Sequence, residues 1–339
     1  MSQKMKSPGS VLSGEVSGLP SDRPALIGDI GGTHARFALV SSSGEIRRET
    51  VVPTRAYPDL RAALGAYLEE TDAEVPLRGA VVCAAGPLAH GEIRLCNGPW
   101  VVSEDALKRV TGAADPVLLN DFTAVALSIP TLARSDLRFL GGRESEPGCA
   151  IGVLGPGTGL GVSGAIPTRD GHWAAITGEG GHVSLAPATR RESDVVLSLH
   201  ERFGHASGER VLSGSGIETL YRVLCELDGN VPEDLDAAKI ALRGNRQECE
   251  TCHEVVNLFA AWLGSVAGDL ALTLGAKGGV YVAGGIIPKW SDAFNTRLFR
   301  ERFEAKGRFS DYLQPIPTYL VTAKYPVFAG LAALATRVA

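Results

Sequence analysis

The sequence predicts an α/β protein built from two similar domains that face each other across a central cleft. Two observations lead to this expectation. The chain has 339 residues, which exceeds one ordinary compact core and suits two domains. A pattern of strand, glycine turn, returning strand and hairpin also occurs twice, and such a duplication implies two similar domains. A cleft between domains is a common place for a ligand.

The first copy of the pattern follows the N-terminal segment. Residues 25–30 (ALIGDI) form an apolar run that predicts a buried strand. Residues 31–33 predict a tight turn, and residues 35–40 alternate as expected for the returning strand. Residues 41–44 (SSSG) predict a hairpin turn before a third strand at 46–52.

The remainder of the first half alternates between helix and strand. Leucines at every fourth position after Pro58 predict a helix. Residues 79–84 predict another apolar strand. Ser103, followed by two acidic residues, predicts a capped helix start. Residues 117–120 predict a short buried strand that delivers Asp121 at its C-terminal end.

The second copy repeats these features. Residues 149–154 predict a buried strand, 155–159 a glycine turn and 160–166 the returning strand. A hairpin turn at 170–171 precedes a third strand. The glycine–threonine pair of the first turn recurs at the same position in the second turn, which supports the duplication.

The last third of the chain is more helical. Residues 255–274 are apolar and rich in Ala and Gly, and predict one buried helix or a pair of helices. Residues 279–285 predict a strand that ends in glycines. Residues 328–338 predict a short closing helix.

These elements set the expected domain bounds. Residues 1–23 are rich in Ser, Gly, Pro and Lys and have no apolar stretch of signal-peptide length, so we expect a disordered tail. We expect a small domain at 24–131 together with 326–339, and a large domain at 132–325.

Composition excludes several classes of function. The net charge of −5 disfavours a nucleic-acid surface, which needs excess Lys and Arg. No run approaches the roughly 18 apolar residues of a membrane span. We therefore expect a cytoplasmic protein with no nucleic-acid and no membrane partner.

Six cysteines are spread thinly, which indicates reduced thiols rather than a disulfide framework. One spacing, Cys249-x-x-Cys252-His253, fits a c-type haem attachment pattern and also half a zinc site. No second Cys-x-x-Cys is present to complete a zinc site. Two unrelated cysteines at the start of a helix are the third interpretation.

The sequence contains no common phosphate-binding loop. No Gly-Lys dipeptide occurs, so a Walker A loop is excluded. Gly159-x-Gly161-x-x-Gly164 matches a dinucleotide-binding fingerprint, but a strand rather than a helix is expected there, so the match is interpreted as accidental.

The two glycine–threonine turns are better candidates for binding phosphate. Glycines let backbone N–H groups approach phosphate oxygens, and a threonine hydroxyl adds a donor. Each turn taken alone is also consistent with a plain hairpin. Asp29 precedes the first turn, and a carboxylate beside phosphates calls for a cation, so we expect a Mg²⁺ ion held by Asp29 through water.

Six motifs together resemble the bacterial-type glucokinase family, in the order in which that family has them. They are 29–33 (DIGGT), 120–123 (NDFT), 155–161 (GPGTGLG), 178–182 (GEGGH), 209–214 (ERVLSG) and 283–286 (AGGI). The resemblance covers about residues 24–339 and is more specific than any single motif. It implies the actin-like (ribonuclease-H-like) ATPase fold, with the C-terminal helix closing the first domain.

The resemblance also assigns roles to residues. Asp121 is the expected catalytic base, which accepts the proton of the glucose 6-hydroxyl as it attacks the γ-phosphate of ATP. The expected sugar-binding residues are Asn120, Asp121, Glu179, His182 and Glu209. The expected nucleotide-binding residues are Asp29, Gly31, Gly32, Thr33, Gly157, Thr158, Gly159, Gly284 and Gly285.

Structural interpretations of the same residues stay open beside these roles. Asn120 and Asp121 are also typical of a helix N-cap. Glu179 and His182 fit a structural pair in a glycine-rich turn, and Glu209 fits an ordinary surface helix. The two glycines that end the strand at 279–285 also suit a strand-to-helix turn.

Departures from the family pattern are modest. The family commonly has Asn after Gly-Gly-Thr, where this chain has His34. The zinc-binding cysteine cluster of the repressor/kinase (ROK) sugar kinases is missing. No helix-turn-helix segment precedes the first predicted strand, which disfavours a DNA-binding sugar repressor.

The expected activity is phosphorylation of D-glucose to glucose 6-phosphate by ATP with Mg²⁺. The alternatives are a kinase for another hexose, such as mannose or fructose, and a non-catalytic sugar sensor on the same fold. A degraded catalytic aspartate or a basic DNA-binding arm would favour the sensor, and the sequence has neither. A homodimer is suggested by the resemblance alone.

Overall fold

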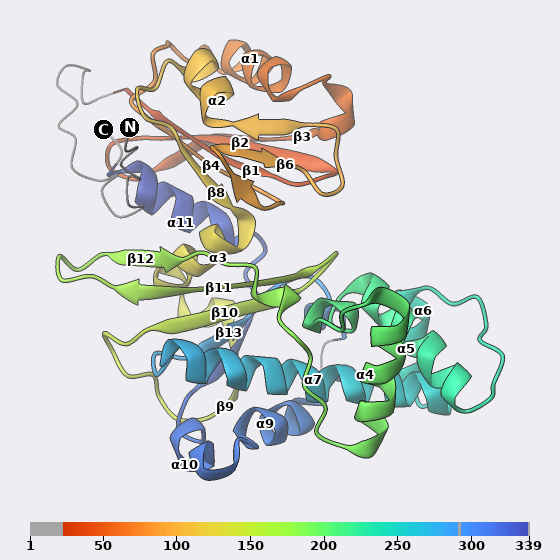
Figure 1. Ribbon diagram of the computed structural model, residues 1–339. Coiled ribbons are helices and arrows are strands. Elements are labelled where there is room, and N and C mark those ends of the chain that lie inside the picture. Colours follow the sequence, from red (N-terminus) through yellow and green to blue (C-terminus); the bar gives the residue numbers. More distant parts are fainter. Residues whose placement is uncertain (1–22, 291–292, 338–339) are drawn as a thin grey trace, which may run out of the picture. The chain divides into compact units, whose positions relative to one another are not determined.

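The computed structural model describes residues 23–290 and 293–337, which form two compact units (Figure 1). The described part of unit 1 runs to Ala124 and resumes at Tyr325, and unit 2 comprises Val125–Lys324. Nearly all of the predicted disordered tail, residues 1–22, lies outside the described residues. So does Val338, the predicted end of the closing helix.

Unit 1 is built on a mixed sheet with the strand order β3-β2-β1-β4-β8. The strands are β1 (Ala25–Ile30), β2 (His34–Val40), β3 (Ile46–Pro53), β4 (Ala80–Ala84) and β8 (Val117–Asn120). β1 pairs antiparallel with β2 and parallel with β4, and β8 runs parallel beside β4. The sequence predicted each strand to within one residue at either end.

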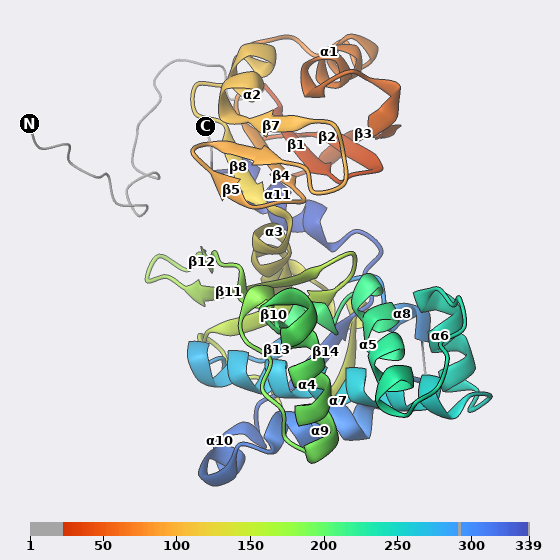
Figure 2. The ribbon, with the colours of Figure 1, turned by 45° about the vertical axis from the view of Figure 1, so that its right-hand side comes forward.

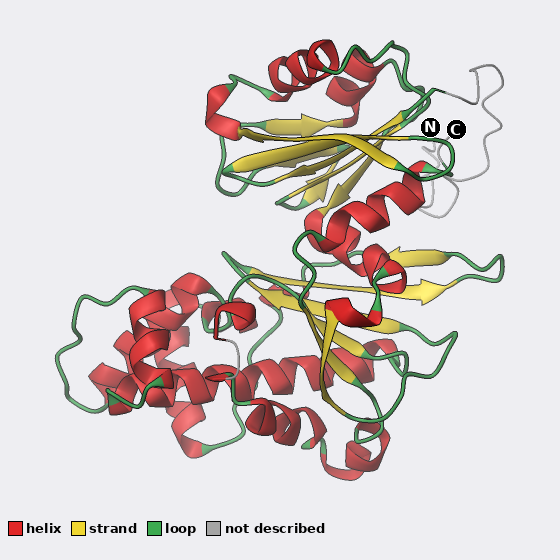
Figure 3. Cartoon of the chain, turned by 180° about the vertical axis from the view of Figure 1, so that it is seen from behind, coloured by secondary structure: helices red, strands yellow, loops and turns green. Residues whose placement is uncertain are grey.

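Helices cover both faces of this sheet. They are α1 (Leu60–Glu70), α2 (Glu104–Thr111) and α11 (Pro326–Ala335). α1 and α2 lie on one face and α11 lies on the other, against β1 and β4 (Figures 1 and 3). Ser103 accepts a hydrogen bond from the Ala106 backbone N–H, which confirms the predicted cap of α2.

Smaller elements complete unit 1. A three-stranded sheet contains β5 (Leu88–Ala89), β6 (Glu92–Arg94) and β7 (Val101–Ser103), and a 3₁₀ helix η1 (Thr54–Ala56) follows β3. Helix α3 (Asp121–Ser128) starts directly after β8, and its first half belongs to unit 1 and its second half to unit 2. The C-terminal end of β8 therefore leads straight into a helix N-terminus.

Unit 2 contains a sheet with the order β12-β11-β10-β13-β14-β9. The strands are β9 (Leu137–Gly141), β10 (Ile151–Pro156), β11 (Leu160–Pro167), β12 (Trp173–Ile176), β13 (Val280–Val282) and β14 (Thr318–Val321). The run β12-β11-β10-β13-β14 has the same order and strand directions as β3-β2-β1-β4-β8. This agreement confirms the repeat that the sequence predicted.

The helices of unit 2 gather around α7 (Figure 2). The α-helices are α4 (Arg190–Phe203), α5 (Gly214–Leu227), α6 (Ala237–Asn245), α7 (Glu250–Leu274), α8 (Ile287–Trp290), α9 (Thr296–Glu304) and α10 (Ser310–Leu313). The 3₁₀ helices are η2 (Ile129–Thr131), η3 (Arg134–Asp136), η4 (Gly180–His182), η5 (Gly208–Arg210) and η7 (Gly307–Phe309).

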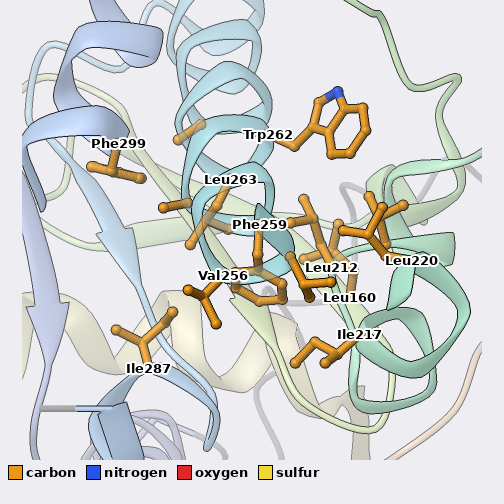
Figure 4. Close-up of a cluster of buried hydrophobic side chains, with 14 of the residues drawn as sticks. Leu160, Leu212, Ile217, Leu220, Val256, Phe259, Trp262, Leu263, Ile287 and Phe299 are labelled. Atoms are coloured by element: carbon orange, nitrogen blue, oxygen red, sulfur yellow. The ribbon is translucent and has the colours of Figure 1, made fainter. Parts of the chain in front are cut away.

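Helix α7 is the centre of the core of unit 2. The sequence left open one helix or two, and the structure has a single helix of 25 residues. Val256, Phe259 and Leu263 on α7 meet side chains from neighbouring elements (Figure 4). Those neighbours include Leu160, Leu212, Ile217, Leu220, Ile287 and Phe299. By length and composition α7 could cross a membrane, but 61% of its most apolar window is buried within the protein, as in a core helix.

Two glycines on α7 allow α9 to pack closely. A Cβ atom at Gly264 would overlap the backbone carbonyl oxygen of Phe299, and one at Gly268 would meet that of Phe303. Backbone atoms cannot move aside as a flexible side chain can. Gly65 on α1 is the opposite case, because a Cβ atom there meets nothing within 4 Å.

These glycines give a paired prediction about stability. Gly264→Ala is expected to lower the free energy of unfolding by about 1–3 kcal/mol, because α9 must shift away from α7. Gly65→Ala is expected to raise it by about 0.5–1 kcal/mol, since Ala is the better helix former. Urea unfolding of both variants would check this. Equal effects of the two substitutions would contradict the close packing of α7 and α9.

A buried ion pair connects α4, α7 and α9. Arg302 on α9 donates from Nη2 to Glu192 Oε2 at 2.9 Å, and its Nη1 donates to the other carboxylate oxygen. Its Nε donates to Ser265 Oγ on α7 at 3.1 Å. The Glu192 side chain is 1% exposed and the Arg302 side chain 14%. The pair is therefore largely removed from water.

Candidate active site

The proposed catalytic base stands at the junction of β8 and α3. Asp121 is the first residue of α3, is half-buried, and accepts a hydrogen bond from the Phe122 N–H at 2.9 Å. The N-terminus of a helix favours a negative charge at this position. A carboxylate is thus fixed at the end of β8. The sequence predicted this strand to be buried, but within it only Leu118 is buried and the other three residues are half-buried.

The structural interpretation of Asn120 as a helix cap is confirmed. Asn120 Oδ1 accepts from the N–H groups of Phe122 and Thr123 at 2.9 and 3.4 Å. Its Nδ2 donates to the Gly86 carbonyl oxygen at 2.9 Å. These bonds hold the start of α3, and therefore Asp121, in place. The cap is compatible with a second role, because an amide oxygen and nitrogen offer further hydrogen-bonding positions.

Asp29 lies in a polar row that crosses the sheet of unit 1. In register, Asp29 on β1 stands between Arg36 on β2 and Cys83 on β4. Arg36 Nη1 donates to Asp29 Oδ2 at 2.8 Å, and Cys83 Sγ donates to Asp29 Oδ1 at 3.7 Å. The Arg36 guanidinium also lies 4.5 Å from the centre of the Tyr325 ring. Sequence reasoning missed both Arg36 and Cys83.

The thiol of Cys83 is buried next to the Asp29 carboxylate. Burial, and then the negative charges of Asp29 and Asp121, raise the pKa of Cys83 well above its ordinary value. The neutral thiol that results can donate to Asp29. Ile30 of β1 pairs with Ala84 of β4, and Ala84 pairs with Asn120 of β8, so the strand ends that carry Asp29 and Asp121 lie at the same edge of the sheet.

The first glycine turn is shaped by packing. Gly31 N–H donates to the His34 carbonyl oxygen at 2.9 Å, and Gly32 O accepts from Thr54 Oγ1 at 2.7 Å. A Cβ atom at Gly32 would overlap the backbone carbonyl of Asn97. Gly32 is therefore required by the fold, whether or not it also meets a phosphate. Thr33 and His34 are exposed.

The second glycine turn contains a position that packing leaves free. Gly157 N–H donates to the Gly159 carbonyl oxygen at 2.8 Å, and Gly157 O accepts from Gly214 N–H at 2.9 Å. A Cβ atom at Gly157 would meet nothing within 4 Å. Neither a clash nor a backbone angle requires glycine at this position. Thr158, between the two glycines, is exposed.

Glu209 connects this turn to the proposed sugar residues of unit 2. Its Oε2 accepts from the Leu160 N–H at 2.9 Å, and a Cβ atom at Gly159 would overlap the same oxygen. Its Oε1 lies 4.0 Å from His182 Nδ1. Glu209 belongs to the 3₁₀ helix η5 and is one-third exposed. Glu209 is therefore not an ordinary surface helix residue, because its carboxylate is one-third exposed and accepts a hydrogen bond from Leu160, which follows the second glycine turn.

Glu179 is the N-cap of the 3₁₀ helix η4, and His182 is the last residue of that helix. The His182 N–H donates to the Glu179 carbonyl oxygen at 3.0 Å, and both side chains are exposed. The His182 imidazole faces Glu209, so a structural pair of Glu179 and His182 side chains is not what the structure holds. His205, which sequence reasoning missed, contacts the His182 carbonyl oxygen through Nε2 at 3.0 Å.

Of the two glycines after β13, one is required by close packing, like Gly32, and the other faces open space, like Gly157. Gly284 has a φ of +87°, and a Cβ atom there would overlap the Pro156 carbonyl oxygen, so it is required by the turn into α8. A Cβ atom at Gly285 meets nothing within 4 Å. Gly284 is therefore required by the fold, whether or not it also meets a nucleotide, whereas packing does not require Gly285.

The residues present fit a Mg²⁺ ion that arrives with a nucleotide. Within residues 23–290 and 293–337, no three His, Cys, Asp or Glu side chains are arranged to hold a metal ion. Mg²⁺ is usually bound by one or two carboxylates, water and substrate phosphates rather than by a protein cage. Asp29 alone satisfies that requirement, because each carboxylate oxygen keeps a second lone pair beside its present partner.

Comparisons with known proteins cover almost the whole chain. A family model described as Glucokinase matches residues 26–338. A glucokinase of Chromobacterium violaceum is 46% identical over 317 residues, which are 94% of this chain and 90% of that protein. A crystal structure of a glucokinase from an Antarctic psychrotroph is 34% identical, with a TM-score of 0.82 over 92% of this chain and 98% of that chain.

A more distant solved structure shows the fold alone. The glucokinase of Balamuthia mandrillaris, crystallised in complex with glucose, is 20% identical. Its TM-score is 0.72 over 93% of this chain and 94% of that chain. The arrangement of elements described above thus recurs where little of the sequence does.

Proposed function

The chain belongs to the glucokinase family, and from this premise we propose that it phosphorylates glucose with ATP, using Asp121 as the general base. The observation that carries this proposal is the half-buried Asp121 carboxylate at the start of α3. Asp121 accepts the proton of the glucose 6-hydroxyl as that oxygen attacks the γ-phosphorus. ADP leaves, and glucose 6-phosphate is the product. Phosphoryl transfer otherwise needs mainly positioning and charge neutralisation.

The sugar is held by groups that can each pair with hydroxyls. The proposed set is Asn120, Asp121, Glu179, His182 and Glu209. Carboxylates accept from hydroxyls, and amide and imidazole groups both donate and accept, so the set can orient a polyhydroxylated ring. The ring of hydroxyls also explains why the same acids would bind epimers of glucose.

The nucleotide is held by backbone groups of the two glycine turns. The residues proposed for this are Gly31, Gly32, Thr33, Gly157, Thr158, Gly159, Gly284 and Gly285, with Asp29. Backbone N–H groups and threonine hydroxyls donate to phosphate oxygens. Bound Mg²⁺ would neutralise charge on the phosphates, and Asp29 would hold the water around it. Arg36 orients the Asp29 carboxylate through its ion pair.

Several wider expectations belong to the same proposal. The duplicated sheet is expected to be the actin-like ATPase fold, with domains at 24–131 plus 326–339 and at 132–325. The protein is expected in the cytoplasm, with glucose and ATP as its small-molecule partners. A homodimer is expected from the family alone.

Hexose-dependent ADP release tests the proposed activity. Purified protein with ATP and Mg²⁺ is expected to release ADP with D-glucose, and to release little with no sugar. A panel of mannose, fructose and glucose separates a glucokinase from a kinase for another hexose. Absence of ADP release with every hexose, together with measurable sugar binding, would favour the non-catalytic sensor.

The open space at Gly157 gives a test of the second turn. Gly157→Ala is expected to leave stability unchanged, because its Cβ atom meets nothing. If the turn binds phosphate, the methyl group costs about one charge-assisted hydrogen bond, so KM for ATP rises roughly ten- to a hundredfold. Steady-state kinetics with Gly65→Ala as the matched open-space control would measure it. An unchanged KM for ATP would remove the turn from the nucleotide site.

Gly159→Ala complements this test within the same turn. Its methyl group would displace the Glu209 carboxylate from the Leu160 N–H. The proposal therefore expects KM for glucose to rise in Gly159→Ala, whereas Gly157→Ala should act on KM for ATP alone.

A further inference from the structure

The proposed function does not use the pair Cys249 and Cys252. The sequence left three interpretations of this Cys-x-x-Cys spacing: haem attachment, half a zinc site, and two unrelated cysteines at a helix start. The structure places Cys249 as the N-cap of α7 and Cys252 in its first turn. The two cysteines therefore belong to the same turn at the start of α7.

The Cys249 sulfur lies against the backbone of Cys252. Cys249 Sγ accepts a hydrogen bond from the Cys252 backbone N–H at 3.4 Å. The Cβ atom of Cys252 is two bonds from this nitrogen. A rotation of the Cys252 side chain can therefore bring its sulfur toward Cys249 Sγ. Burial, and then a hydrogen bond to the Cys249 side chain, raise the pKa of Cys252 to about 12. The backbone N–H of Cys252 is thus directed toward Cys249 Sγ, within the first turn of α7.

A metal site is not what surrounds these thiols. Cys225 on α5 is the third thiol nearby, and among the residues that the structure describes no group of three His, Cys, Asp or Glu could hold a metal ion. The His253 ring is turned away, with Nδ1 against the Gly244 carbonyl oxygen at 3.1 Å and Nε2 against Asn257 at 3.0 Å. His253 is therefore engaged with α6 and with its own helix.

The two thiols differ in accessibility. Cys249 is half-buried, whereas Cys252 is 0% exposed. A reagent in solution can therefore reach Cys249 first, and Cys252 is placed to attack the product from the protein side. Because access is one of the factors that set the rate of thiol–disulfide exchange, this difference makes Cys249 the entering thiol and Cys252 the resolving thiol.

We propose that Cys249 and Cys252 form a reversible dithiol–disulfide pair that exchanges with small-molecule disulfides such as oxidised glutathione. Cys249 sulfur attacks one sulfur of the disulfide, which forms a mixed disulfide and releases one glutathione thiol. Cys252 sulfur then attacks Cys249 sulfur and releases the second thiol. The protein loses two hydrogen atoms, and the oxidant is reduced to two thiols. In a reducing compartment such a bond is transient and senses the redox state.

Peptide mass analysis after redox equilibration tests the pair. The full-length protein is equilibrated in buffers of increasing oxidised-to-reduced glutathione ratio, quenched with acid, alkylated and digested with trypsin. Cleavage after Arg246 and Lys277 leaves both cysteines in one peptide, 247–277, that contains no other cysteine. We expect this peptide to gain an internal disulfide as the ratio rises, and to lose it on treatment with dithiothreitol.

Three outcomes would overturn the proposal. The peptide could stay fully alkylated in every buffer, or carry glutathione without closing, or become linked to the peptide that contains Cys225. Exposed Cys96 lies in a separate tryptic peptide and reports non-specific oxidation. Closure of 247–277 only in buffers where Cys96 is already fully modified would also count against a dedicated pair.

Two variants keep the test independent of folding. Cys249→Ser retains a helix cap, because Ser is a preferred N-cap residue, so the protein is expected to fold and phosphorylate glucose. It should lose the internal disulfide completely and leave buried Cys252 unmodified. Cys252→Ala should trap the mixed disulfide on Cys249. Glutathione on Cys252 in the Cys249→Ser variant would contradict the proposed entry at Cys249.

Discussion

Replacing Asp121 by asparagine is expected to lower kcat by about 10²- to 10⁴-fold, while KM for glucose changes little. Asparagine has the same shape and can still accept from the Phe122 N–H, as Asp121 Oδ1 does at 2.9 Å. The cap made by Asn120 is untouched, so the start of α3 should be preserved. What is lost is the ability to take the proton of the 6-hydroxyl.

Coupled measurement of ADP release, with glucose binding measured separately, would check this result. Asp105→Asn is a matched control, because Asp105 is also an acidic residue in the first turn of a helix of unit 1. It should retain full activity. Near-normal turnover of Asp121→Asn would show that another group removes the proton.

Removing one partner of the buried ion pair should have the largest effect on stability. Glu192→Gln leaves the charge of Arg302 in a site where that side chain is 14% exposed, and the expected loss in the free energy of unfolding is about 3–5 kcal/mol. Urea unfolding followed by tryptophan fluorescence would measure it, since Trp262 is buried on the adjoining α7. The double variant Glu192→Gln with Arg302→Met should recover part of the loss, because no unpaired charge remains.

An exposed pair on the same helix provides the control. Arg297 and Glu301 on α9 are 2.7 Å apart, but their side chains are 88% and 53% exposed. Glu301→Gln should therefore leave the free energy of unfolding almost unchanged, in spite of the short distance. Equal losses in Glu192→Gln and Glu301→Gln would contradict the assignment of stability to burial.

Helices and strands whose signals lie in residues close together along the chain could be predicted from the sequence. The apolar run at β1 and the acidic start of α2 each contain their own signal, and both lie where they were expected. The repeat of strand, turn and strand was visible for the same reason. The length of α7 was only partly visible, because a buried apolar segment has no clear periodicity at its start.

The surroundings of the candidate site depended on contacts that sequence spacing does not contain. Arg36 and Cys83 become neighbours of Asp29 only once three strands are in register. Glu209 meets Leu160 across 49 positions of the chain. Glycine roles were also indistinguishable, because Gly32 and Gly157 look alike in sequence although one is packed against Asn97 and the other faces open space.

The two units share one strand order, but the segments that connect their strands differ in length. The connection from the third strand to the next parallel strand runs from Pro53 to Ala80 in unit 1, and from Ile176 to Val280 in unit 2. Glu179, His182 and Glu209 all belong to the longer connection. Lengthening a connection at the surface costs little chain entropy. Three of the five proposed sugar-binding residues therefore lie in a segment that can change in length and sequence while the sheets and the glycine turns stay as they are.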